Sequence, residues 1–77
     1  MSDYYNKVKK VIAEKTGLEL SEISAESYFE DDLNVGEMEL IEILEELEEA
    51  FHVDLIEDAG NFVTVQDVVD ALDEHIQ

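Results

Sequence analysis

Residues 31–40, DDLNVGEMEL, lead from an acidic, turn-like segment directly into an apolar, Glu-rich helix. The junction presents Glu37, and it contains no serine, cysteine or histidine that could serve as a nucleophile or a general base. Beyond the junction, apolar residues recur at helical spacing: Leu40, Leu44, Leu47 and Phe51. The pattern predicts a helix over residues 37–51 whose apolar stripe faces a core.

The rest of this helix is strongly acidic. Met38, Ile41 and Ile43 widen the apolar surface beyond the stripe, and glutamates fill much of the remainder, with no lysine four residues away to offset them. An acid at Glu37 is favoured by the helix macrodipole, by about 0.3–1 kcal/mol, and this alone is a sufficient reason for its presence.

Two further helices are expected. The first covers residues 3–15 and has Gly17 as a C-cap, with this apolar set: Tyr5, Val8, Val11 and Ile12. The last opens at Thr64 as N-cap, with Asp67 in the capping-box position. Its apolar stripe is Val65, Val68, Val69, Leu72 and Ile76. Residues 57–62 are expected to form a short irregular or helical piece.

A long connection over residues 18–36 is rich in Ser and Glu. It also carries apolar residues that we expect to hold it against the core, because long structureless loops are uncommon in compact domains. These residues are Leu18, Leu20, Ile23, Tyr28, Phe29, Leu33 and Val35. No alternating strand pattern, internal repeat or linker is present, so residues 1–77 are predicted to form one all-α domain.

The charge of the chain is lopsided. All four basic residues lie within residues 7–15, and the formal net charge is −18. Such a surface repels phosphate backbones and anionic headgroups, which argues against nucleic acid and membranes as partners and favours a basic protein surface. The absence of cysteine, of a signal peptide and of a long apolar run favours a cytoplasmic protein. We expect a monomer.

The sequence gives no sign of an active site or a metal site. His52 and His75 are far apart, fit no metal-ligand spacing and are interpreted as solvent-facing. Residues 31–37 only superficially resemble a calcium loop, because Leu33 and Val35 occupy the third and fifth positions. We predict no catalytic residues and no metal ligands, so the protein is not expected to be an enzyme.

Four segments, in order and spacing, resemble the acyl carrier proteins of fatty-acid and polyketide synthesis: KVKKVIAEKTGL, FEDDL, ELIEILEELEEAFHVDL and TVQDVVDAL. The resemblance implies an acyl-carrier-like four-helix bundle, with three main helices, one short helix and a long ordered first loop. In that family an Asp-Ser-Leu motif opens the second helix, and its serine carries phosphopantetheine. Here the matching residues are Gly36, Glu37 and Met38.

The resemblance therefore implies the fold without the attachment serine, and phosphopantetheine is predicted to be absent. The favoured function is a non-catalytic interaction, regulatory or scaffolding module in a carrier-dependent lipid or polyketide system. Alternatives are a working acyl carrier with an unrecognised attachment site, and non-covalent lipid binding between the helices. Glu37 is either an ordinary first-turn acid or an imitation of the phosphodiester of a modified carrier.

The second helix is the expected docking surface, since the family positions that match Met38 and Ile41 touch partner enzymes; the alternative for these two residues is ordinary packing. Its acids would steer a basic partner, while apolar side chains would anchor it. The predicted partner-binding residues are Glu37, Met38, Glu39, Ile41, Glu42, Glu45, Glu48 and Glu49.

Overall fold

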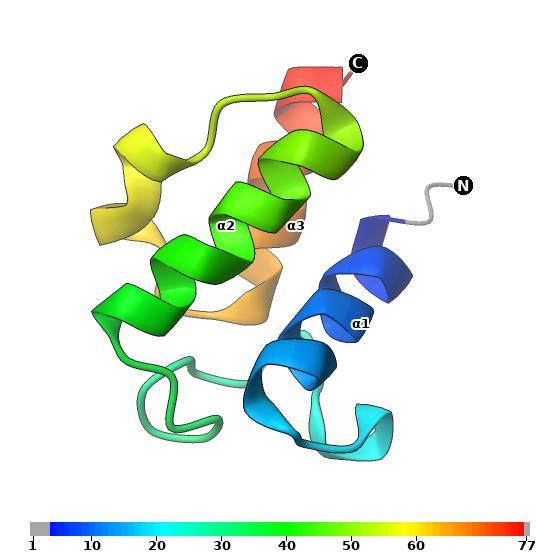
Figure 1. Cartoon of the computed structure of the whole chain (residues 1–77), viewed down its shortest axis with the longest axis vertical. Coiled ribbons are helices and arrows are strands. Elements are labelled where there is room, and N and C mark those ends of the chain that lie inside the picture. The colour runs from blue at the N-terminus through cyan, green and yellow to red at the C-terminus, as the bar shows by residue number, and fades with distance from the viewer. Residues whose placement is uncertain (1–3, 77) are drawn as a thin grey trace.

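The computed structural model describes residues 4–76 and contains three α-helices and two 3₁₀-helices. In chain order they are α1 (Tyr4–Thr16), η1 (Leu20–Glu22), α2 (Glu37–Phe51), η2 (Ile56–Asn61) and α3 (Val65–Ile76). Figure 1 shows η2 beside α2, with the long connection between α1 and α2 passing below both. Within residues 4–76, β-type pairing is limited to one isolated antiparallel bridge between Tyr28 and Thr64. The predicted all-α bundle is confirmed, and its short helix is the 3₁₀-helix η2.

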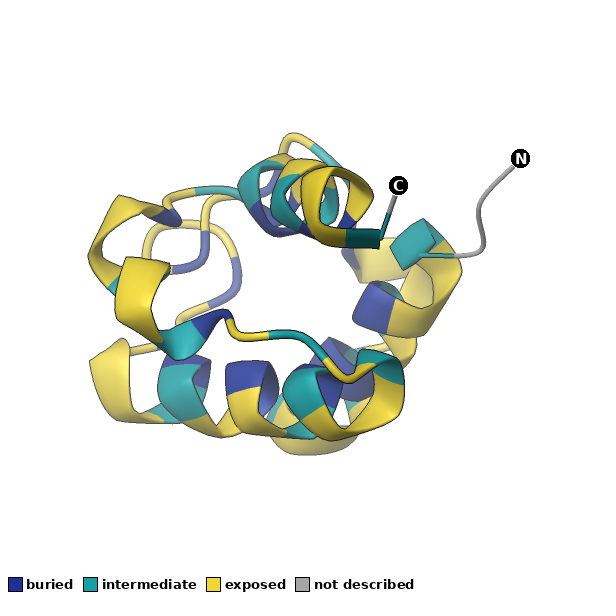
Figure 2. Ribbon diagram, turned by 90° about the horizontal axis from the view of Figure 1, so that it is seen from above, coloured by how far each residue is buried: buried dark blue, intermediate teal, exposed yellow. Residues whose placement is uncertain are grey.

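One apolar core joins the three α-helices to the long connection, as the inward-facing dark segments of Figure 2 show. α1 contributes Val8, Val11 and Ile12, and α3 contributes Val65, Val68 and Leu72. Tyr5, Val69 and Ile76 are only partly buried against this core. The two outer helices therefore bury the stripes predicted from the sequence, with their margins left at the surface.

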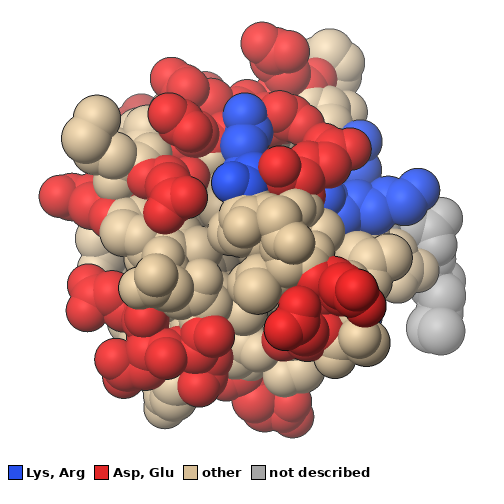
Figure 3. All heavy atoms as spheres, turned by 60° about the horizontal axis from the view of Figure 1, so that its bottom comes forward, with Lys and Arg blue, Asp and Glu red and all other residues tan. Residues whose placement is uncertain are grey.

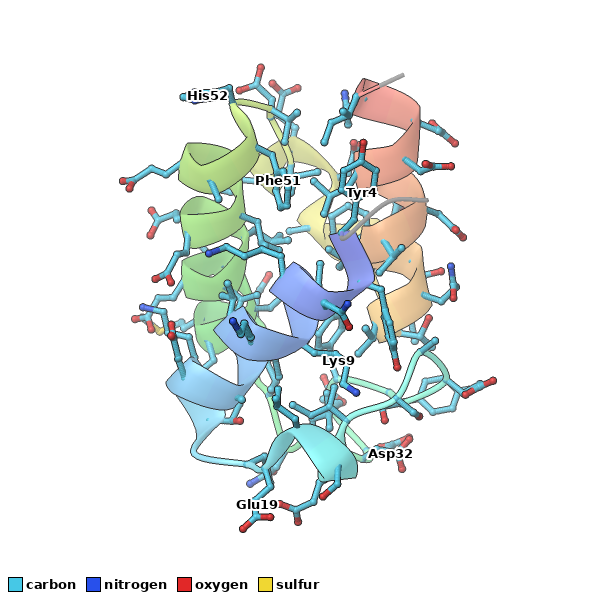
Figure 4. All side chains as sticks on the ribbon, turned by 90° about the vertical axis from the view of Figure 1, so that its right-hand side faces the viewer. Tyr4, Lys9, Glu19, Asp32, Phe51 and His52 are labelled. Atoms are coloured by element: carbon cyan, nitrogen blue, oxygen red, sulfur yellow. The ribbon has the colours of Figure 1, made fainter. Side chains whose placement is uncertain are left out.

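Helix α2 has the bounds predicted for it. Leu40, Leu44 and Leu47 are buried, and Ile43 is fully buried beside them. The core-facing side of α2 is therefore wider than the four-residue stripe. Phe51 lies at the edge of the core, where its ring meets that of Tyr4 edge to face with 5.5 Å between the ring centroids. Figure 4 shows these two rings facing each other at the same end of the bundle.

The first helix ends as expected at a left-handed glycine. Gly17 has φ +80°, and its N–H donates to the carbonyl oxygen of Ala13 over 2.8 Å. A residue without Cβ adopts this conformation at little cost. The predicted start of this helix at residue 3 lies outside the described residues.

The long connection is held to the core by part of its predicted apolar set. Ile23, Phe29, Leu33 and Val35 are buried, and Leu18 is partly buried. The prediction was wrong for Leu20 and Tyr28, which are 45% and 48% exposed. Leu20 lies on the short turn η1, which directs Ile23 inward instead. Tyr28 lies in extended backbone, where successive side chains point to opposite sides, so Phe29 takes the inward direction.

The start of α3 is a capping box, as predicted. The Oδ2 atom of Asp67 accepts the N–H of Thr64 over 3.0 Å, and the Oγ1 atom of Thr64 accepts the N–H of Asp67 over 3.3 Å. The long connection completes this end of the helix. Its Ser27 and Ala25 carbonyl oxygens accept the N–H groups of Val65 and Gln66, over 3.1 and 2.9 Å. The first three N–H groups of α3 are thus all bonded.

Candidate functional site

The start of α2 is the candidate site, because it is where the resemblance places the reactive group of a carrier. Gly36 is the N-cap residue, with φ −81° and ψ 179°, and no side chain caps the helix. The N–H of Leu40 donates to the carbonyl oxygen of Gly36 over 2.9 Å and closes the first turn. Buried Val35 and Leu40 hold the junction on either side. Glu37 is therefore fixed at the first helical position with its side chain exposed.

The predicted docking residues all lie at least partly at the surface of α2. Met38 is 80% exposed, and the carboxylates of Glu42, Glu45 and Glu49 are exposed as well. Their spacing of three or four residues places these four side chains on one face of the helix, away from the core. Glu39 and Ile41 are partly buried at the margins of that face. The arrangement combines an exposed apolar side chain with a row of carboxylates.

Glu48 has an intramolecular role that its place in the sequence did not reveal. Its Oε2 atom accepts the N–H groups of Leu55, over 2.6 Å, and Ile56, over 3.0 Å. These donors lie where the chain enters η2, so the carboxylate of Glu48 stabilises the connection between α2 and η2. Its prediction as a partner contact is untested, and the carboxylate is already engaged within the fold.

A pocket of about 390 Å³ opens beside the start of α2. The long connection, α2, η2 and the segment after η2 form its walls. The lining residues are Tyr28, Phe29, Glu30, Asp31, Val35, Gly36, Glu37, Leu40, Ala59, Gly60, Phe62 and Val63. Sequence reasoning missed this pocket, because its walls combine residues 28–40 with residues 59–63, and the intervening part of α2 separates these two stretches along the chain.

Acidic side chains surround the surface at this end of the molecule. Figure 3 shows the end that lies at the bottom in Figure 1, with groups of carboxylates around a central area of other residues and the lysine side chains toward the upper right. Within residues 4–76 there is one ion pair, between the Nζ atom of Lys15 and the Oε1 atom of Glu46, 3.5 Å apart. The carboxylates on the outer face of α2 are therefore free to meet an external cation.

Both histidines are exposed, which confirms their interpretation from the sequence. His52 follows α2 in the left-handed conformation, with φ 59° and ψ 48°, and points away from the bundle in Figure 4. Among the described residues, no group of three or more potential ligands is arranged to hold a metal ion. No helix within the same residues is long and apolar enough to cross a bilayer.

A comparison with protein families agrees with this architecture. A family model described as "Phosphopantetheine attachment site" matches residues 6–72. The match runs from α1 into α3 and includes the junction at Glu37, the pocket and the whole of α2. The chain is therefore a member of the phosphopantetheine attachment-site family and has the helical bundle of the acyl carrier proteins.

Proposed function

We propose that this protein works without a phosphopantetheine arm, as a non-catalytic docking module of a carrier-dependent lipid or polyketide system. It binds a basic surface of a partner protein through α2 and regulates or scaffolds that partner. The fold and its outer helix are those of a carrier, while the group that would carry the cargo is replaced.

The observation that carries this proposal is the exposed carboxylate of Glu37 at the first position of α2. The resemblance places the attachment serine of the family at this position. Attachment of the arm requires a hydroxyl oxygen that forms a phosphodiester, and a phosphopantetheinyl transferase cannot form this bond with a carboxylate. Gly36 in addition lacks the acidic side chain that precedes the serine in the family.

Nearby hydroxyl groups have other roles in the fold. Ser27 is buried, with its Oγ atom 3.1 Å from that of Ser24, and the Oγ1 atom of Thr64 caps α3. Among the described residues that line the pocket, Tyr28 alone carries a hydroxyl group. These placements favour a protein without a covalent arm over a carrier that uses a substitute serine or threonine beside α2.

The outer face of α2 supports the docking part of the proposal. Its exposed carboxylates attract a basic surface, increase the rate of encounter and disfavour acidic partners. Met38, and Ile41 at the margin, supply apolar contacts that can slow dissociation. In this mode, charge selects the partner and the apolar side chains retain it.

Intact-mass measurement tests the missing arm. The protein is incubated with coenzyme A and a permissive phosphopantetheinyl transferase, beside an ordinary carrier as positive control. We expect no mass gain for the unaltered protein and weak labelling of the Glu37→Ser variant. The double variant Gly36→Asp/Glu37→Ser should be labelled better, because it also restores the acid that precedes the serine in the family. The fold should accept this change, since Gly36 has an ordinary backbone conformation and no heavy atom lies within 4 Å of an added Cβ.

The opposite outcome is equally informative. Efficient labelling of the unaltered protein would overturn the proposal and favour a working acyl carrier. Fragmentation of the labelled chain would then identify the attachment residue.

A further inference from the structure

The outer face of α1 is a basic surface on an otherwise acidic molecule. All four lysines of the chain lie on this helix, and Glu14 is its single acid, so α1 has a formal charge of +3 while the whole chain has −18. We propose that this face binds a short acidic segment of a second partner protein. The inference goes beyond the proposed docking through α2, because it concerns another helix and a partner of the opposite charge.

Only part of this positive charge is used within the fold. The Nζ atom of Lys15 lies 3.5 Å from the Oε1 atom of Glu46 and joins α1 to α2. Lys7 and Lys10 are exposed, and within residues 4–76 neither of them forms an ion pair. If the lysines served only to offset neighbouring carboxylates, we would expect each of them to pair as Lys15 does. Lys7 and Lys10 instead present their charge to the outside.

The lysines have a spacing that suits an acidic helix. Lys7 and Lys10 lie three residues apart, so they share one face of α1. Lys9 is partly buried at the edge of this face, and its Nζ atom lies 5.1 Å from the centroid of the Tyr5 ring. This cation–π contact favours one position for the ammonium group. Carboxylates three or four residues apart on a facing helix would have the same spacing as these ammonium groups.

The limits of the basic face favour a short segment over an extended polyanion. Glu14 is exposed one turn beyond Lys10, and residues 17–77 contain no Lys or Arg. A nucleic acid or an anionic bilayer would cover carboxylates as well as lysines and would be repelled. A short acidic segment meets the lysines alone. Exposed charges beyond a Debye length, about 8 Å at physiological ionic strength, are largely screened from it.

The basic face of α1 and the acidic face of α2 point in different directions. Figure 4 looks onto α1, with α2 and α3 behind it on either side, and carboxylates of α2 project to the left of the view. A basic partner bound to α2 therefore leaves α1 accessible. With both faces occupied, the protein joins a basic partner to an acidic one, as a scaffold does.

Three peptides test the selection for an acidic segment. They are blocked, alanine-based helical peptides of equal length, with glutamate, glutamine or lysine at every third or fourth position. Each is titrated into the ¹⁵N-labelled full chain at constant ionic strength while amide NMR shifts are followed. We expect the glutamate peptide to give saturating shifts around Lys7 and Lys10, and a repeat at higher NaCl should show weaker binding. The glutamine peptide should cause no saturating change, and the lysine peptide should shift amides of α2 instead.

Matched variants separate the two free lysines from the general charge. Lys7→Gln and Lys10→Gln should each weaken binding of the glutamate peptide roughly two- to five-fold, the range of an exposed ion pair. Lys15→Gln removes the same charge from the same helix and should have a smaller effect, because Lys15 is paired with Glu46. The double reversal Lys7→Glu/Lys10→Glu should transfer binding at α1 to the lysine peptide. Both residues are exposed, so the fold should tolerate the reversal.

Several results would overturn the inference. One is the absence of saturating shifts with the glutamate peptide at millimolar concentration. Equal binding of the glutamine peptide, or an equal loss on Lys15→Gln, would show that Lys7 and Lys10 have no specific role. Stronger shifts at α1 with phosphatidylglycerol vesicles or a single-stranded oligonucleotide than with the glutamate peptide would assign this face to another class of partner.

The inference and the proposed function fail separately. Labelling by coenzyme A would remove the proposed function, while the titrations would still report on α1. Conversely, failure of the glutamate peptide would leave the absence of labelling and the response of α2 to the lysine peptide unchanged.

Discussion

The first turns of α2 and α3 are built in opposite ways, although both carry an acid. At α3, Asp67 accepts two backbone N–H groups, from Val63 over 2.9 Å and from Thr64 over 3.0 Å. At α2, within the part of the chain that the structure describes, the first three N–H groups have no protein acceptor and Glu37 bonds to nothing. One acid is used inside the fold, and the other is presented to the outside.

The difference distinguishes a helix end whose polar groups are bonded within the fold from one whose polar groups are free to bind another molecule. A capped terminus satisfies its own donors and contributes to stability. A terminus without a side-chain cap, beside a pocket, keeps both donors and carboxylate free for something that binds. An acid in the first turn of a helix therefore says little about function until its hydrogen-bond partners are known.

The largest effect is expected from removing the α3 acid. Asp67→Ala should lower the free energy of unfolding by about 1–3 kcal/mol, because the carboxylate caps two backbone donors. Glu37→Ala should cost only the macrodipole contribution, about 0.3–1 kcal/mol. Chemical denaturation of both variants checks the comparison. Equal losses at the two sites would show that the two termini do not differ in this way.

Neighbouring acids on α2 offer a second contrast. Glu48→Ala should destabilise the protein by about 1–3 kcal/mol, since the partly buried carboxylate accepts two N–H groups at the start of η2. Glu49→Ala, on the exposed face, should stay within about 0.5 kcal/mol of the unaltered protein. Thermal unfolding distinguishes them. A Glu48 variant as stable as the Glu49 variant would refute the bridging role of Glu48.

Docking should respond to charge on α2 more than to charge on α3. A partner captured from the native extract is first identified and purified. The double reversal Glu42→Lys/Glu49→Lys should then slow its association and flatten the salt dependence, at about 1 kcal/mol or less per charge. Ile41→Ala should mainly speed dissociation. Surface-binding kinetics measure both rates.

The control for docking is the double reversal Asp73→Lys/Glu74→Lys on α3. Both residues are exposed, whereas Asp67 caps the helix and the Oδ1 atom of Asp70 accepts a hydrogen bond from the Nε2 atom of Gln66 over 2.8 Å. A control pair that weakens binding as much as the α2 pair would place the interface elsewhere or make it purely electrostatic.

The smallest effects concern the N-cap residues themselves. Gly36→Asp should stabilise the protein by about 0.3–1 kcal/mol, because an acid at this position can cap α2 and the unfolded chain loses freedom. Thr64→Gly, the reverse change at α3, should cost a few tenths of a kcal/mol. Calorimetry of both variants measures the pair. Destabilisation by Gly36→Asp would mean that the junction needs glycine for a reason other than backbone conformation.

Local signals made α2 and the α3 cap predictable. The bounds of α2 follow from apolar residues three or four positions apart, and the capping box of Thr64 and Asp67 spans three residues. Such patterns depend on helix geometry alone. The family resemblance added the bundle and the special position of Glu37. It could not assign the free or bonded state of any carboxylate.

Features that join distant segments were not predictable in the same way. Glu48 reaches donors seven and eight residues ahead through an irregular turn. The pocket brings Asp31 near Gly60, and the outward direction of Tyr28 depends on its bridge to Thr64. Each of these depends on how the chain is packed, and none leaves a periodic trace in the sequence.

The bonds between the long connection and α3 have a consequence for local opening. Amides in the first turn of a helix ordinarily exchange quickly with solvent, because they lack partners within the helix. Here Val65 and Gln66 donate to Ser27 and Ala25, and Phe29 donates to Val63 over 3.0 Å. Exposure of these amides requires residues 25–29 of the connection to separate from residues 63–66 at the start of α3. These amides should form one cooperative unit that exchanges slowly with solvent, while the amides in the first turn of α2 exchange quickly.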